Sequence, residues 1–461
     1  MIIRGNEDRH HMKPQKPNTT RGGRLLLGTF WIGLYFLLTI GPLAIIYLGE
    51  APPGRGFWIE LSIALGFIGM AMITVQFVIT ARIDRINGPY GIDVIYQFHR
   101  QISILSITLI LIHPIMLFAA DPDRYLPLLR IWEAPLRAVL AWLGLLGLIT
   151  IAATSIWRVK LGLSYETWRI LHGILAVAVL ALALGHVLGV GHYLEQFWQR
   201  GMWVGMAAIV VLVSGYVRLV KPLLMQRKPW RVVNVRRECG RSWTVELEPD
   251  GHRGLRFQPG QFAWVTFGRS VWMIREHPFS FSSSAERSGR VAFTIKENGD
   301  FTDHIGETKP GTPAYLDGPH GVFTIDRRPD VKGAVFIAGG IGVTPIMSML
   351  RTLADREDSR RFVLIYGCPA WDQVTFRDEW SELEKRLDLK VIIVLDDPPE
   401  GWEGESGRID EALLQRHLPE DRAAYEHYIC GPPAMMASVR EVLPTIGVPA
   451  ERIEMEEFEL A

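Results

Sequence analysis

The sequence predicts a multi-domain membrane protein that combines a transmembrane helical bundle, an antiparallel β-barrel and an α/β domain with a parallel sheet. Hydrophobic residues make up 48% of the 461 residues, and they are concentrated before residue 221 in runs long enough to cross a bilayer. After residue 231, apolar and polar residues alternate as they do in β-strands. From residue 334 onward, short β-branched runs alternate with helical patterns, which is typical of a parallel sheet with crossover helices.

Six apolar runs in the first half are each close to the ~20 residues that a transmembrane helix needs. They cover residues 25–48, 57–80, 94–120, 138–157, 168–190 and 202–220. A polar and basic segment, residues 1–24, precedes them. Because the first run is too long for the core of a signal peptide, we expect a retained anchor. A basic linker, residues 221–231, follows the sixth run.

Lys and Arg are more frequent in the connections after the second, fourth and sixth runs than in the other connections. Such an asymmetry places the basic connections on the cytoplasmic side of a membrane. We therefore expect a multi-pass protein of the cell (inner) membrane, with both termini and the whole second half in the cytoplasm.

Four of the thirteen histidines lie inside the predicted transmembrane runs. His99 and His113 are fourteen residues apart in the third run, and His172 and His186 have the same spacing in the fifth. At about 100° and 1.5 Å per residue, the members of each pair lie ~21 Å apart near one face of a helix. Ionisable side chains inside a membrane are costly and are usually functional. Taken singly, each histidine would also be compatible with a hydrogen-bonded core residue.

The equal spacing predicts two metal sites, one in each leaflet. Two histidines ~21 Å apart cannot bind one ion, but the third and fifth runs cross in the same direction and can each supply one ligand to each site. We expect two haems, with His99 paired to His172 near the inner leaflet and His113 paired to His186 near the outer leaflet. No Cys-x-x-Cys-His motif is present, so the haems would be b-type.

Composition argues against nucleic-acid binding and against a disulfide framework. The formal net charge is zero, whereas a nucleic-acid-binding domain is usually basic. The three cysteines, Cys239, Cys368 and Cys430, have no disulfide or metal spacing, which suits a reducing cytoplasm.

A glycine-rich turn follows a predicted buried strand and opens a predicted helix, with the sequence Ala338-Gly-Gly-Ile-Gly-Val-Thr-Pro345. Its glycines would let the backbone approach a pyrophosphate closely, and a helix N-terminus attracts an anion. We expect Thr344 at the N-cap and Pro345 at the first helical position. A plain tight turn would use the same residues, so the motif alone leaves both interpretations open.

Two stretches of the predicted barrel carry polar groups suited to a bound dinucleotide. They are His277-Pro-Phe-Ser-Phe-Ser-Ser-Ser284 and Ile295-Lys-Glu-Asn-Gly-Asp-Phe-Thr302. The first places hydroxyls along a strand, and the second places Lys296 near turn amides; these groups suit a ring and its phosphates. A strand with an exposed polar face and an ordinary hairpin would show the same patterns.

The second half of the chain resembles the ferredoxin–NADP reductase family of flavin modules. The matching elements, in family order, are Pro259-Gly-Gln-Phe262, His277-Pro-Phe-Ser280, residues 296–302, Asp317-Gly-Pro-His-Gly321, residues 338–345, Tyr366-Gly-Cys368 and Cys430-Gly-Pro-Pro433. The first half resembles the ferric-reductase-like haem domain. The fusion is similar to the NADPH oxidase and ferric reductase superfamily, as a minimal bacterial-type member. The resemblance implies a di-haem membrane domain at 25–221, an FAD-binding barrel domain at 226–328 and an NAD(P)H-binding domain at 329–461.

The resemblance also implies roles for individual positions. The isoalloxazine of FAD would be held by His277, Pro278, Phe279 and Ser280, and the FAD diphosphate by Lys296, Gly299, Phe301 and Thr302. The nicotinamide dinucleotide would be held by Gly339, Gly340, Gly342, Thr344 and Pro345, with Cys430, Gly431 and Pro432 near the nicotinamide. Cys430 and Phe458 are the catalytic candidates.

Two positions depart from the family pattern. Related modules end with an aromatic residue stacked on the flavin where nicotinamide must land, whereas three residues follow Phe458 here. Relatives that use NADPH often carry a basic residue just after the Tyr-Gly-Cys element, and this chain has Pro369-Ala-Trp-Asp372 there. Because Arg377 or Arg408 could substitute, we favour NADPH over NADH.

The chemistry of these cofactors gives an electron path. NAD(P)H gives a hydride and a haem iron accepts one electron, so a flavin is the adaptor between them. We expect electrons to pass from NAD(P)H through FAD, the inner haem and the outer haem to oxygen on the outer face, producing superoxide. A ferric or cupric chelate reductase would use the same path, but the short outer connections favour oxygen. A relay to a periplasmic protein would need a docking surface, and a transporter with a histidine proton path would leave the flavin module unexplained.

Overall fold

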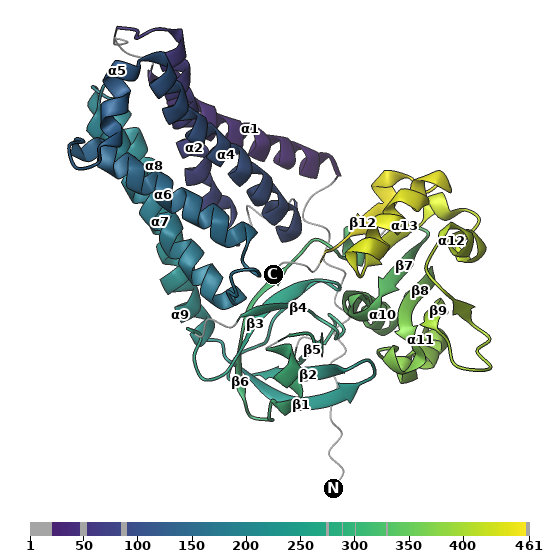
Figure 1. Ribbon diagram of the computed structural model, residues 1–461. Helices are drawn as coiled ribbons and strands as arrows, with labels where there is room; N and C mark the ends of the chain where they lie inside the picture. The colour runs from purple at the N-terminus through teal and green to yellow at the C-terminus, as the bar shows by residue number, and fades with distance from the viewer. Residues whose placement is uncertain are drawn as a thin grey trace.

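The computed structural model describes residues 21–46, 53–83, 90–272, 276–287, 289–299, 301–328 and 331–457. The predicted segment 1–24 therefore lies almost entirely outside the described residues, and Phe458 lies outside them. A long helical bundle stands above a β-barrel, and a second sheet with its helices lies beside the barrel (Figure 1). This arrangement confirms the predicted fold class.

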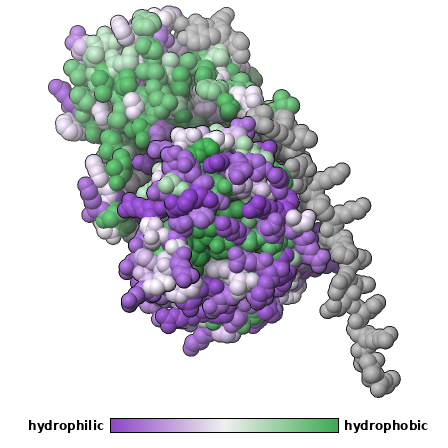
Figure 2. Space-filling model, turned by 90° about the vertical axis from the view of Figure 1, so that its right-hand side faces the viewer, coloured by the Kyte–Doolittle hydropathy of each residue, from purple (hydrophilic) through white to green (hydrophobic). Residues whose placement is uncertain are grey.

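Six described helices are long and apolar enough to cross a membrane. They are α1 (Arg21–Ile46), α2 (Phe57–Ile79), α4 (Ile92–Ala120), α6 (Leu136–Ile156), α7 (Tyr165–Val190) and α8 (Phe197–Gly215), which continues to Gln226. Short helices α5 (Pro122–Tyr125) and η1 (Leu126–Leu129) connect α4 to α6. In Figure 2 hydrophobic side chains cover the bundle and hydrophilic ones cover most of the remainder of the visible face. Apolar residues facing outward are what a lipid environment requires.

Local signals fix the ends of these helices. The Ser164 side chain accepts a hydrogen bond from Thr167 N at 3.2 Å and caps α7, and Gly191, with φ +70°, ends it. The sixth span differs from the sequence prediction: it begins at Phe197 and passes through a π-helical turn (η2, Tyr216–Val220) into α9 (Lys221–Gln226). The first residues of the predicted linker are therefore helical, and Pro222 stands in the first turn of α9, directly after the π-helical turn.

The barrel is a six-stranded antiparallel sheet in the order β4-β3-β6-β1-β2-β5. Its strands are β1 (Trp230–Glu238), β2 (Ser242–Pro249), β3 (Phe262–Phe267), β4 (His277–Ser280), β5 (Val291–Lys296) and β6 (Pro313–His320). A bridge between Phe281 and Phe293 joins the two edges, β4 and β5, and closes the barrel. Both phenylalanines are fully buried in its core.

The second sheet is parallel, in the order β10-β9-β8-β7-β11-β12. Its strands are β7 (Gly333–Gly339), β8 (Arg361–Ala370), β9 (Asp388–Asp397), β10 (Glu405–Ser406), β11 (Glu426–Cys430) and β12 (Ile453–Met455). Successive side chains of β7 point to opposite faces: Phe336 packs on the side of α10 (Val343–Asp355) and α11 (Trp380–Arg386), and Val335 on the side of α12 (Glu411–His417) and α13 (Pro433–Thr445). Because both faces of the sheet are covered, the central strand β7 is apolar along its whole length.

Helix α10 joins the two sheets. Its Ser348 hydroxyl donates to Ser283 O at 2.7 Å, and Arg351 donates to Ser282 O at 2.6 Å. In the reverse direction, Ala285 N donates to Thr352 Oγ1 at 2.9 Å. The glycine-rich turn that precedes α10 is thereby fixed against the barrel.

Candidate functional site

The four intramembrane histidines lie on α4 and α7 and form two facing pairs. The ring centroids of His99 and His172 are 6.3 Å apart, with the ring planes at 75°. His113 and His186 line one cavity further along the same two helices. Helix α4 packs against α2, and α7 packs against α6, whereas α4 and α7, both described throughout, do not pack closely on each other. In each pair, one histidine of α4 and one of α7 therefore lie on opposite sides of a space between these two helices.

Each of these histidines has an oxygen close to its Nδ1 atom. The partners are Gln76 Oε1 at 3.0 Å for His99, Ser62 O at 2.9 Å for His113, Ser155 Oγ at 3.4 Å for His172 and Arg137 O at 2.8 Å for His186. Such a partner fixes the orientation of the ring and leaves Nε2 as the nitrogen for a metal. Histidines that ligate metals almost always have one.

The pairs line two cavities. The one with His113 and His186 has a volume of about 480 Å³, and the one with His99 and His172 has a volume of about 1020 Å³ and reaches the barrel residues Glu276 and Asp317. Gly66 of α2 lies against the first cavity, where a Cβ atom would stand 3.3 Å from the ring of His113. A glycine there lets α2 approach α4 closely without displacing the histidine.

The residues of the inner pair fit a bis-histidine haem. Two imidazoles on opposite sides of one metal have metal–nitrogen distances of about 2 Å each, so their ring centroids lie about 6 Å apart; the observed separation is 6.3 Å. A porphyrin supplies the equatorial ligands, so two protein ligands suffice. Within the described part of the chain, no group of three or more His, Cys, Asp or Glu side chains could hold a metal ion by itself.

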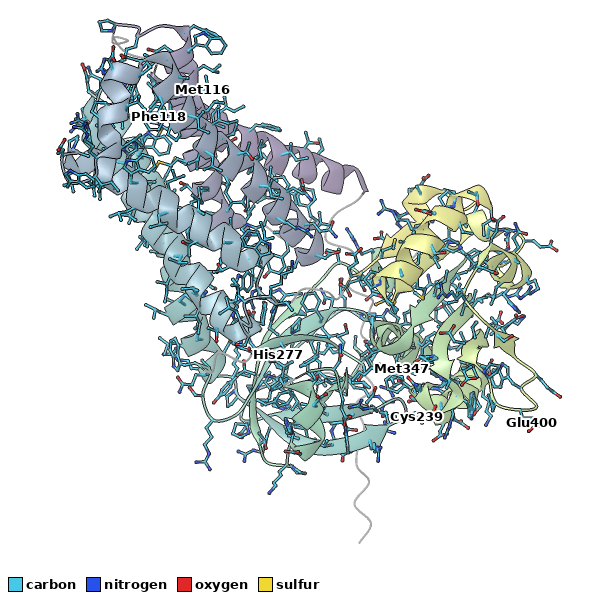
Figure 3. The ribbon with its side chains drawn as sticks, viewed as in Figure 1. Met116, Phe118, Cys239, His277, Met347 and Glu400 are labelled. Carbon is cyan, nitrogen blue, oxygen red and sulfur yellow. The ribbon has the colours of Figure 1, made fainter. Side chains whose placement is uncertain are left out.

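The predicted flavin strand is β4, at one edge of the barrel and facing the bundle. Figure 3 shows His277 between the base of the bundle and the barrel. The His277 ring stacks on the Phe301 ring with centroids 4.2 Å apart, and the Phe279 ring centroid lies 6.5 Å from that of Phe301. The Oγ atom of Ser280 is buried and has no hydrogen-bond partner among the described residues. A buried polar atom normally has a partner, so an FAD bound along β4 would complete this site. Pro278 lies between these residues, paired with Trp264 of β3.

The following serines serve a different purpose. Ser282 Oγ accepts a hydrogen bond from Thr294 Oγ1 at 3.0 Å, and Ser283 Oγ accepts one from Ala292 N at 3.1 Å. Ser282 and Ser284 are buried. These hydroxyls therefore make hydrogen bonds within the barrel, and the buried Ser282 and Ser284 do not lie on an exposed strand face.

The loop after β5 groups several backbone amides. Asn298 N donates to Thr302 Oγ1 at 2.8 Å, and Gly299 N donates to Asp303 Oδ1 at 3.3 Å, at the start of the short helix η3 (Thr302–Glu307). Gly299 has φ +114°, and a Cβ atom at this position would have no described neighbour within 4 Å. Lys296 ends β5 and lies close to Cys368: burial raises the pKa of the Cys368 thiol to about 11, and the lysine opposes that rise.

The glycine-rich turn forms a short 3₁₀ segment, η5 (Gly340–Gly342), between β7 and α10. Gly342, and not Thr344, stands at the N-cap, so this prediction was wrong. The helix starts one residue before Thr344 because η5 already has helical geometry, and Thr344 Oγ1 instead donates to Ile341 O at 2.9 Å. Pro345 accordingly lies in the first turn of α10, at its third residue.

Close packing brings this turn against the Cys430-Gly431-Pro432 element. A Cβ at Gly342 would stand 2.4 Å from Cys430 O, and one at Gly339 would stand 2.6 Å from Pro432 Cδ. Gly340 has φ +52° and open space around it. These elements follow the adjacent parallel strands β7 and β11, at the carboxyl edge where open α/β sheets bind ligands.

A buried acid beside Cys430 was not predicted from the sequence. Burial raises the pKa of the Cys430 thiol well above its usual value, and the nearby Glu456 carboxyl adds to the effect. Glu456 is 5% exposed, and its Oε2 atom has no hydrogen-bond partner in the described part of the chain. Burial, followed by the charge of Asp93, raises the pKa of Glu456 well above its usual value. In the sequence, Glu456 looks like one acid of a charged tail.

The partners of the histidines were also missed, although the sequence carries a signal for two of them. Ser62 and Gln76 are polar residues inside the apolar helix α2, and both are buried. Polar residues inside membrane helices usually face the interior of the bundle and are functional.

Three family models match the chain. They are described as ferric reductase like transmembrane component over residues 65–183, FAD-binding domain over residues 238–311, and oxidoreductase NAD-binding domain over residues 336–441.

Individual proteins are similar to part of the chain. NADH-cytochrome b5 reductase 1 of Lodderomyces elongisporus is 30% identical over 171 residues, which are 36% of this chain and 56% of that protein, so the chain spans just over half of this relative. A probable dihydroorotate dehydrogenase B (NAD(+)) electron transfer subunit of Methanopyrus kandleri is 30% identical over 234 residues, 50% of this chain and 78% of that protein. Among solved structures, the FAD/NAD binding domain of a nitric oxide dioxygenase from Vibrio cholerae gives a TM-score of 0.45 at 22% identity, covering 50% of this chain and 98% of that one.

Proposed function

Because the chain belongs to the NADPH oxidase and ferric reductase superfamily, we propose that it transfers electrons from cytoplasmic NAD(P)H across the membrane to oxygen and so produces superoxide. It is a multi-pass membrane oxidoreductase with FAD- and NAD-binding domains. The proposed route uses FAD and two b haems, with His99, His172, His113 and His186 as the axial ligands.

One observation carries the proposal: His99 and His172 face each other at 6.3 Å inside a cavity that extends to the barrel. When bound, FAD takes a hydride from NAD(P)H and passes single electrons on to haem iron. The protein side chains bind and orient these groups. Gln76 and Ser155 fix the inner pair of histidines, Ser62 and Arg137 fix the outer pair, and β4 lies at the base of the bundle.

The lining of the outer cavity supports oxygen as the acceptor. Most of its side chains are apolar, among them Phe67, Leu145 and Leu148. A small neutral molecule could reach the edge of a haem held in this cavity by His113 and His186, and electron transfer at that edge would be outer-sphere. An outer-sphere transfer of this kind needs access for the acceptor and no further metal ligand.

A ferric or cupric chelate reductase is the second candidate, and a different feature favours it. Arg55, Arg124 and Arg137 line the same cavity, and their positive charge would attract an anionic chelate. Both candidates share the electron path, so only the acceptor separates them.

The acceptor is tested with purified protein in lipid nanodiscs supplied with NADPH. In air, we expect reduction of added cytochrome c that superoxide dismutase abolishes. Without oxygen, ferric citrate replaces oxygen as the acceptor. Ferric reduction much faster than superoxide formation would reject the oxidase and favour the chelate reductase.

Orientation is tested separately by adding protease to spheroplasts. The positive-inside rule predicts that residues 230–461 are protected. Rapid digestion of this half would place the nicotinamide site outside and would contradict the proposed direction of electron flow.

A further inference from the structure

A buried ion network connects the barrel to three elements of the membrane domain. Glu276, directly before β4, pairs with Arg82, which follows α2, at 2.5 Å, and also with Arg169 of α7. Asp317 of β6 pairs with Lys221 of α9 at 2.7 Å and with Arg82 at 3.6 Å. The side chains of Glu276 and Asp317 are 21% and 8% exposed. Two carboxylates of the barrel are thus held by cations from three parts of the bundle.

Arg82 holds both carboxylates at once. Its backbone has φ +52°, a left-handed conformation that non-glycine residues seldom adopt, and an outlier of this kind often marks a constrained functional position. Its guanidinium also lies over the ring of Trp264 in β3, 4.0 Å from the centroid. From the end of a transmembrane helix, Arg82 therefore contacts β3, β6 and the residue that precedes β4.

The first two turns of α7 connect the flavin strand to the inner haem site. Glu166, Arg169 and His172 are spaced three residues apart, so each is next to the following one on the helix surface. Glu166 Oε1 is 3.9 Å from His277 Nε2, Arg169 pairs with Glu276, and His172 faces His99. Six residues of helix rise by about 9 Å, so α7 fixes β4 within about that axial distance of the haem ligand.

The charges of the network persist over a wide pH range. Burial alone would raise the pKa of Glu276, but Arg82 and Arg169 hold it below its usual value. Burial would likewise raise the pKa of Asp317, but His320, Lys221 and Arg82 hold it well below its usual value. Both carboxylates are therefore ionised at neutral pH and remain paired with their cations.

We propose that Glu276 and Asp317 are positioning residues that dock the barrel on α2, α7 and α9 and so set the distance from the flavin to the inner haem. This inference rests on the proposed function. The rate of electron transfer falls steeply as the distance between donor and acceptor increases. A small displacement of the barrel, without any unfolding, is therefore enough to reduce the rate. Reduction of the flavin by NAD(P)H takes place within the barrel and the parallel sheet, so it does not depend on the docking.

The test compares Glu276→Gln and Asp317→Asn with Glu248→Gln. Glu248 pairs with Arg290 on the barrel and is 41% exposed, so this control also removes one carboxylate from the barrel, away from the bundle. Stopped-flow absorbance separates reduction of the flavin by NAD(P)H from reduction of the haem. We expect flavin reduction at the parent rate in all three variants, and haem reduction slowed roughly 10- to 100-fold in the first two only.

A second measurement is independent of the cofactors. Spin labels on cysteines at the exposed positions Lys160 and Arg269, in a Cys239→Ser background, report the distance between bundle and barrel. We expect the distribution of this distance to become broader in Glu276→Gln and to remain narrow in Glu248→Gln. On the membrane side, Arg169→Lys should retain most of the haem reduction rate and a narrow distribution of label distances, whereas Arg169→Met should lose both. These two Arg169 variants also test the network if Glu276→Gln does not accumulate in cells.

Haem reduction at the parent rate together with an unchanged label distance in the carboxylate variants would overturn the inference. Equal slowing of flavin and haem reduction would also overturn it, because the residues would then act on the flavin site itself. If the parent protein fails to reduce its haem, the proposed function is wrong, and the label distances still decide whether the network docks the barrel.

Discussion

The imidazole rings of His99 and His172 face each other across the space between α4 and α7, and the Nδ1 atom of His99 lies 3.0 Å from Oε1 of Gln76. Gln76 belongs to α2 and is 5% exposed. A hydrogen bond at Nδ1 fixes the imidazole ring and increases the basicity of Nε2. The contact is consistent with a supporting role for Gln76 at the proposed inner haem site.

Replacing Gln76 with Leu should weaken haem binding at the inner site by about 10- to 100-fold, the usual effect of losing such a partner. Ser62→Ala is the matched control on the same helix: His113 Nδ1 contacts both Oγ and the backbone O of Ser62, so the backbone acceptor remains. Haem content after dilution into apomyoglobin measures the loss. Equal haem retention in both variants would show that Gln76 does not support a ligand.

His186→Ala should remove the outer haem and leave the inner haem in place. His192→Ala is its control, because His192 lines the same cavity without belonging to a pair. Flavin reduction by NAD(P)H should persist in both variants, since neither residue lies near the barrel. The haem-to-flavin ratio of the purified variants measures the effect. Two haems with unchanged spectra in His186→Ala would reject the ligand assignment.

Arg377→Ala should reduce kcat/KM for NADPH and leave that for NADH nearly unchanged. The Arg377 guanidinium lies 5.4 Å from the ring centroid of Trp371, in the segment after β8. The family pattern assigns the start of this segment to recognition of the 2′-phosphate. Loss of a charge-assisted hydrogen bond of ~1.5–3 kcal/mol corresponds to a decrease in kcat/KM for NADPH of about 10- to 100-fold. Arg408→Ala tests the other basic candidate. Equal losses for both nucleotides would argue against recognition of the phosphate by Arg377.

Glu456→Gln should stabilise the flavin module increasingly as the pH rises from 5 to 8. In the unfolded chain this carboxyl has a pKa of about 4.3, whereas burial and then Asp93 raise the pKa in the folded protein. Above pH ~4.3 the unfolded state releases the proton and the folded state keeps it, so this group makes stability fall as pH rises. The glutamine removes that dependence.

The thermal midpoint of the protein, measured at pH 5 and pH 8, checks this prediction. Glu457→Gln is the control, because the neighbouring Glu457 is exposed and its carboxylate accepts from Gln97 Nε2 at 3.2 Å. A Glu456→Gln midpoint that differs from the parent by the same amount at both pH values would show that Glu456 is not a protonated buried acid.

Much of the fold follows from local patterns in the sequence. The six membrane helices and the parallel strands were predicted because apolar runs of bilayer length and β-branched runs are both local signals. The sixth helix was placed too late because its first turn, from Phe197, mixes Gln199 and Arg200 with apolar residues. The N-cap of α10 was placed wrongly because a 3₁₀ turn and a helical turn have the same sequence pattern.

The long-range contacts of the site could not be predicted in this way. The pairing of His99 with His172 follows from equal spacing, but the partners Gln76 and Arg137 lie on other helices. The network of Arg82, Glu276 and Asp317 joins residues far apart in the chain. The family motif that contains Asp317 does not indicate its ion-pair partners. Charged residues beside a membrane helix usually indicate the orientation of the helix in the membrane. A role of Arg82 in docking the barrel therefore could not be recognised from the sequence.

The central claim is that NAD(P)H-derived electrons reach two bis-histidine haems through the flavin. An anaerobic titration of the purified protein in nanodiscs with NADPH, followed by visible absorbance, tests it most directly. We predict a haem Soret band with two haems per flavin, bleaching of the flavin, and full conversion of both haems to the reduced form. Absence of the Soret band, or a bleached flavin beside haems that stay oxidised, would contradict the claim.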